Sequence, residues 1–168
     1  MELVAVLLGG VLALAGTFIA EWHNARTRAA EARRARVEAF RQELSAAVVS
    51  ADYALTMIED KALGFTVRLP DQIDEVLNLV DETVANARKT LLAAIVALPS
   101  GASTEVREAV DQLRRALEEA RAAGVAFAVA YSLHENTPGD AGYYEAHGKL
   151  DDASAALGQI IELARSDL

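Results

Sequence analysis

The chain has 168 residues, a net charge of −9, no cysteine, 52% hydrophobic residues and only 5% aromatic residues. The lack of cysteine excludes disulfides, thiolate metal sites and cysteine nucleophiles, and the acidic balance argues against nucleic acid as a partner. The length predicts one soluble domain besides any anchor, and 35 alanines with few aromatic residues favour closely packed helices over sheets.

The first element is an uncharged stretch of eighteen residues, Leu3–Ala20. As a helix it would be about 27 Å long, close to the hydrocarbon thickness of a bilayer. A cleaved signal peptide is disfavoured by the acidic Glu2, and a buried core helix is disfavoured because the stretch has no polar stripe. We therefore expect residues 1–22 to form a transmembrane anchor.

Small residues recur within this segment at spacings of three and four, which places them on one helix face. They are Gly9, Ala13, Gly16 and Ala20. Such a face lets two membrane helices approach closely and predicts self-association, although glycine and alanine are also common in membrane helices in general.

A basic helical stalk is predicted for residues 23–36. Trp22 precedes it, at the level where an indole ring prefers the membrane interface. The predicted interface also includes four arginines: Arg26, Arg28, Arg33 and Arg34. Arginines beside a span stay on the cytoplasmic side and attract anionic headgroups. We therefore expect a single-pass protein of the cell membrane that contacts the lipid bilayer, with its N-terminus outside and its C-terminal body cytoplasmic.

Residues 37–168 carry the pattern of a helical bundle. The first helix continues without glycine or proline to Leu63, and further helices are predicted from Pro70, from an N-cap at Ser103, and from about Ala141. Short loops between them predict an antiparallel four-helix bundle in an all-α fold. The positions expected to face its core are Val37, Phe40, Leu44, Ala47, Ala51, Ala54, Ile58, Ile73, Leu77, Val80, Val84, Ala87, Leu91, Ala94, Leu98, Val106, Val110, Leu113, Leu117, Ala120, Gly124, Phe127, Tyr131, Tyr143, Ala146, Leu150, Ala153, Leu157, Ile160 and Ala164.

One segment of the third helix departs from an ordinary amphipathic pattern. Ala122–Tyr131 contains ten residues without a charge. It is either a central helix packed on several sides or a surface that another protein covers. In the second case Val125 and Val129 are the candidate protein interface.

The only cluster with the side chains of a metal or acid–base site surrounds the third turn. His134 and His147 flank this turn together with several acidic residues. Bundles that bind two metals use Glu-x-x-His on two helices, which this chain lacks, and it has no phosphate loop, dinucleotide motif or nucleophile elbow. The sequence therefore predicts no enzyme, no catalytic, cofactor or metal residues and no small-molecule substrate.

The apolar N-terminal segment, the sequence Glu21-Trp22-His23 and the arginine-rich run Arg26–Arg41 resemble small membrane-anchored helical proteins of actinobacteria and their phages. Most of those proteins are uncharacterised, so the resemblance implies a topology and no activity. It covers mainly residues 1–45.

The combined features predict a membrane-anchored scaffold, adaptor or accessory subunit that acts by protein association. We expect a homo-oligomer or a membrane-protein partner. A membrane-active oligomer, such as a pore, a holin-like protein or an effector, is the alternative. A sensor or enzyme that uses His134 and His147 is a third hypothesis.

Overall fold

The computed structural model describes residues 2–64, 70–133 and 141–166, and for residues 2–16, 70, 71 and 166 it describes the backbone alone. It contains α1 (Glu2–Met57), a π-helix η1 (Ile58–Ala62), α2 (Pro70–Ala97), α3 (Thr104–Ser132) and α4 (Ala141–Ser166). No strand occurs in these described ranges, so the predicted all-α class is confirmed. The chain forms two compact units, Met1–Glu38 and Ala39–Leu168.

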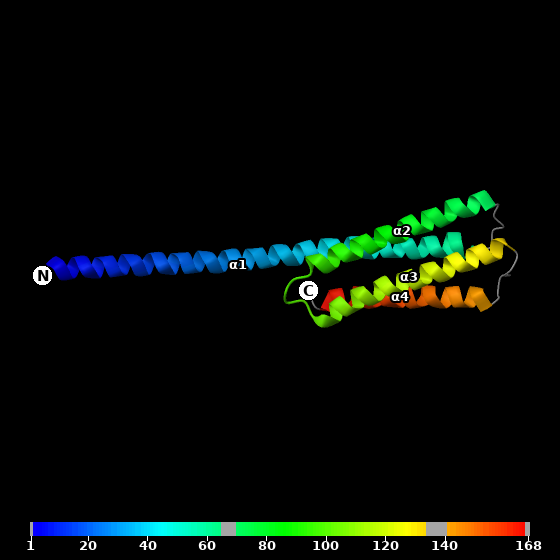
Figure 1. The fold of residues 1–168 in the computed structure, drawn as a ribbon. Coiled ribbons are helices and arrows are strands. Elements are labelled where there is room, and N and C mark those ends of the chain that lie inside the picture. Colours follow the sequence, from blue (N-terminus) through cyan, green and yellow to red (C-terminus); the bar gives the residue numbers. More distant parts are fainter. Residues whose placement is uncertain (1, 65–69, 134–140, 167–168) are drawn as a thin grey trace. The chain divides into compact units, whose positions relative to one another are not determined.

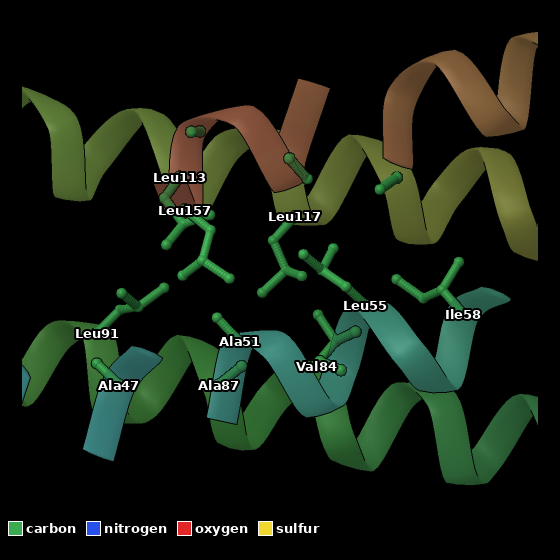
Figure 2. Close-up of a cluster of buried hydrophobic side chains, with 14 of the residues drawn as sticks. Ala47, Ala51, Leu55, Ile58, Val84, Ala87, Leu91, Leu113, Leu117 and Leu157 are labelled. Carbon is green, nitrogen blue, oxygen red and sulfur yellow. The ribbon is translucent and has the colours of Figure 1, made fainter. Parts of the chain in front are cut away.

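The second unit is a bundle in which successive helices run in opposite directions (Figure 1). Its core lies between two layers, one formed by α1 and α2 and the other by α3 and α4 (Figure 2). The short connections favour this up-and-down order, because neighbours in sequence then become neighbours in space.

Two helix starts follow from local chemistry. Ser103 has an extended backbone and is the N-cap of α3; its hydroxyl accepts a hydrogen bond from the Val106 N–H at 3.4 Å. Pro70 is the first residue of α2, where its fixed φ suits a helix and its missing N–H costs nothing. Both starts agree with the sequence prediction.

The core is apolar throughout. No buried polar or charged side chain occurs among the residues whose side chains are described. Most positions expected to face the core are buried, and six are half-buried: Val37, Ile73, Leu77, Tyr131, Tyr143 and Ala164. Burying one large aliphatic or aromatic side chain contributes about 1.5–3 kcal/mol, so this pattern supplies the main driving force for the bundle.

The end of the first helix differs from the prediction, because α1 passes into the π-helix η1. The Leu63 N–H donates to the Ile58 carbonyl at 3.0 Å, a bond that spans five residues instead of four. In an α-helix Lys61 would share the buried face of Ile58. The wider turn leaves Lys61 exposed while Ala62 and Leu63 are buried.

The π-helix fits against α3 at a glycine. A Cβ atom built on Gly124 would lie 2.7 Å from Ile58 Cγ2 and 3.3 Å from Ala62 Cβ. Ile58 is fully buried, so its side chain has little room to move. Gly124 therefore permits an approach of α3 to η1 that any side chain would block.

We predict that Gly124→Ala destabilises the bundle. The clash with Ile58 costs about 1–3 kcal/mol and helix propensity returns about 1 kcal/mol, so we expect a net loss of up to about 2 kcal/mol. Gly158→Ala is the matched control: a Cβ there would have nothing within 4 Å, so alanine stabilises the helix. Urea unfolding followed by circular dichroism measures both; a Gly124→Ala protein as stable as Gly158→Ala would show that Ile58 adapts.

Candidate functional site

The predicted anchor belongs to α1. Gly9, Ala13 and Gly16 lie where the backbone alone is described, so their packing face falls outside the described side chains, whereas Ala20 is exposed. Among the residues whose side chains are described, no helix has a segment that is both long and apolar enough to cross a membrane. The transmembrane span remains a prediction from the sequence.

Exposed apolar side chains lead directly into the arginine-rich part of α1. Phe18, Ile19 and Trp22 expose 71%, 64% and 59% of their surface. The guanidinium carbon of Arg26 lies 5.5 Å from the centre of the Trp22 ring, in a cation–π contact. The other arginines predicted at the interface, Arg28, Arg33 and Arg34, are also exposed. This part of the helix therefore presents aromatic and cationic groups together.

The uncharged stretch Ala122–Tyr131 lies largely inside the bundle. Phe127 and Ala128 are buried, as is Gly124 against η1. Val125 is half-buried and packs against the core, and Val129 is 37% exposed. Ala122 and Ala126 are exposed, so burial explains only part of the missing charge, and the interface at Val125 and Val129 stays a prediction.

A more exposed apolar surface lies on the layer of α1 and α2. Val96 is 86% exposed, Val49 66%, Tyr53 51% and Leu92 43%. We call these four residues the α1/α2 face, although Leu92 also lines a groove between α2 and α3. The residues 44–51 and 90–97 carry no charge, and Figure 2 places Ala47 and Leu91, one from each stretch, in the same part of the layer.

The sequence reasoning followed only the inward positions of each helix and so missed the α1/α2 face. The signal was present in the sequence. A charge-free run leaves no charged residue for the outward positions, so these become apolar or small.

The outer surface along α3 is charged instead. Arg121 donates from Nε and Nη2 to one carboxylate oxygen of Asp81 on α2, at 2.8 and 2.6 Å. Arg88 on α2 pairs with Glu118 at 3.2 Å, and these pairs line an open groove of about 530 Å³ between α2 and α3. Both pairs are partly exposed to solvent, so each contributes modestly to stability and helps to fix the register.

A third pair joins α3 to α4. The Lys149 ammonium donates to Glu119 at 2.9 Å. The hydrogen bond from Lys149 to Glu119 and the negative charge of that carboxylate raise the pKa of Lys149 above its usual value.

The histidine cluster predicted at the third turn is described only in part. His134 lies outside the described residues. The His147 ring packs edge-on against Tyr143, with centroids 4.4 Å apart, and Tyr143 also contacts Phe127. Among the side chains described, no three His, Cys, Asp or Glu residues lie close enough together to hold a metal ion. The described part of this cluster is an aromatic contact between α3 and α4.

Comparison with models of known protein families finds no match, and comparisons with curated proteins and with solved structures find no significant similarity.

We predict that the Asp81–Arg121 pair couples α2 to α3 weakly. A double-mutant cycle with Asp81→Asn and Arg121→Gln should give a coupling of about 0.5–1 kcal/mol at low salt, and less at high salt because solvent ions screen the charges. The pair Asp111–Arg115 is the control. Its atoms are 3.9 Å apart and Arg115 is 70% exposed, so its coupling should be near zero. Equal couplings in the two cycles would contradict this ranking.

Proposed function

We propose that this protein is attached to a membrane through its N-terminal helix and acts by protein association, with the bundle as the module that associates. One observation carries the proposal: the bundle exposes large apolar side chains on its α1/α2 face, and Val96 is 86% exposed. Large apolar side chains exposed on a folded domain mark candidate interaction sites.

We propose a second copy of the same chain as the occupant of the α1/α2 face. The chain carries a net charge of −9, so two copies repel each other wherever their charged surfaces meet. The stretches 44–51 and 90–97 bear no charge, so two such faces can meet without placing like charges together. The predicted helix-packing residues Gly9, Ala13, Gly16 and Ala20 would bring copies together in the same membrane.

Membrane attachment is supported by two features of the N-terminal helix. The uncharged stretch Leu3–Ala20 has the length of a span. The exposed Phe18, Ile19 and Trp22 then provide an apolar and aromatic boundary next to the arginines. The proposed topology follows the arginines, with the bundle on the cytoplasmic side. The resemblance to small anchored proteins of actinobacteria and their phages is consistent with this topology.

The mass of the full chain in mild detergent tests the association. We predict that the natural chain is a dimer or larger and that the double variant Val49→Lys with Val96→Lys is a monomer. The added ammonium groups would have to be desolvated in the interface. Both positions are exposed, so the substitutions should change the free energy of unfolding by no more than about 0.5 kcal/mol each.

The matched control places two lysines on the other layer, as Leu133→Lys with Tyr144→Lys, at positions that are 61% and 67% exposed. This control should keep the mass of the natural chain. A monomeric natural chain would overturn the proposed self-association, and an oligomer that survives Val49→Lys with Val96→Lys would place the contact elsewhere. A chain that stays in solution when detergent is replaced by lipid would overturn the membrane attachment.

A further inference from the structure

The helix from Phe18 to Arg36 has two unlike faces. With 3.6 residues per turn, Trp22, Arg26 and Arg33 lie on one line along the helix, since they are separated by one and two turns. Phe18, Ile19 and Arg36 fall within a quarter turn of that line, whereas Arg34, the residue after Arg33, lies about 100° away from it. We call the six residues Phe18, Ile19, Trp22, Arg26, Arg33 and Arg36 the arginine stripe; all of them are exposed.

The opposite face carries the acidic residues. Glu21 and Glu31 lie about a third of a turn or more from the line of Trp22, Arg26 and Arg33, on the side of Ala35. Arg28 lies on this side as well, and Arg34 lies between the two faces. Both glutamates are exposed, so burial does not impose the separation. One face of the helix is therefore aromatic and cationic, and the other is small and mainly acidic.

From this separation we infer that the arginine stripe binds the surface of a membrane containing anionic phospholipids, with the helix tilted so that this side faces the lipid. Phe18, Ile19 and Trp22 enter the boundary between headgroups and acyl chains, and the arginines bind lipid phosphates with charge-assisted hydrogen bonds. The inference rests on the proposed membrane attachment and adds the lipid class and the face of the helix that meets it.

The charge distribution supports an anionic surface as the ligand. Between His23 and Val37 there are five arginines and one glutamate, whereas the residues after Glu38 include 21 acidic and 11 basic side chains. The stripe is thus a cationic surface in a chain that is otherwise acidic. If the arginines only surrounded the end of an upright span, they would not have to lie on one side of the helix. Every side of an upright helix lies at the same distance from the bilayer.

Nucleic acid is the competing anionic ligand. Its phosphates would suit the arginines but would leave Phe18 and Ile19 in water, and the acidic bundle would repel it. A lipid surface accommodates both kinds of side chain, so the observations favour lipid.

Spin labels on the full chain test the inference, because the natural sequence has no cysteine and one introduced thiol labels a single site. Ala30→Cys lies on the side of the arginine stripe, and Ala35→Cys lies on the opposite face. The labelled chains are placed in nanodiscs of phosphatidylcholine alone or mixed with phosphatidylglycerol, and a water-soluble paramagnetic reagent probes each label.

We expect the label at position 30 to be protected in the anionic discs only, and the label at position 35 to stay accessible in both. Adding Arg33→Gln with Arg36→Gln should lower the equilibrium constant for the protected state by about 25-fold, from about five-fold per arginine. Arg115→Gln is the matched control, since it removes the same charge from an exposed position of the bundle and should change the constant by less than about two-fold.

Equal protection of the two labels would overturn the inference, and so would equal protection in zwitterionic and anionic discs. In both cases a chain that remains with the discs would still support membrane attachment. A chain that does not remain with the discs would overturn the attachment and the inference together. Protection of position 30 by RNA without lipid, at an affinity matching that of the anionic discs, would assign the stripe to nucleic acid.

Discussion

Close packing of small side chains against one another is the constraint on which the bundle depends. Its described core has no polar group that would fix the register through a buried hydrogen bond, so shape has to do this. Alanines at 47, 51 and 87 let α1 and α2 form one layer (Figure 2). Gly124 lets α3 meet the π-helix, where a Cβ would come within 2.7 Å of Ile58. The ion pairs along α3 lie at the edges of these contacts, whose geometry the shapes of the side chains already determine.

Much of this fold could be predicted because it follows from periodicity and from signals at the helix ends. Spacings of three and four identified the buried positions, and Ser103 and Pro70 marked two starts. The π-helix could not be predicted in this way. The sequence Ile58–Ala62 has no glycine or proline that would interrupt an α-helix, and the wider turn also matches a contact with a residue some sixty positions away, Gly124.

The two apolar surfaces, Ala122–Tyr131 and the α1/α2 face, also differ in whether the sequence alone could identify them. Ala122–Tyr131 drew attention because it lacks charge, yet its small residues serve contacts with neighbouring helices, and Val125 packs on the core. The α1/α2 face arises from outward positions, such as Val49 and Val96, in two stretches that are far apart in sequence. Only the antiparallel arrangement of α1 and α2 shows that these stretches belong to one layer. A lack of charge is therefore informative only when the face it affects is known.

The distribution of charge connects the two proposals. Residues after Glu38 are strongly acidic, so they are repelled by an anionic membrane and by one another, whereas the arginine stripe is attracted to that membrane. At physiological salt these forces decay over about 8 Å, so the acidic groups oppose membrane binding only where they come that close to lipid. Association between copies then favours surfaces with little charge, and Val49, Leu92 and Val96 of the α1/α2 face lie in stretches without charge. One chain thus separates its cationic, acidic and uncharged surfaces, and each surface favours a different neighbour.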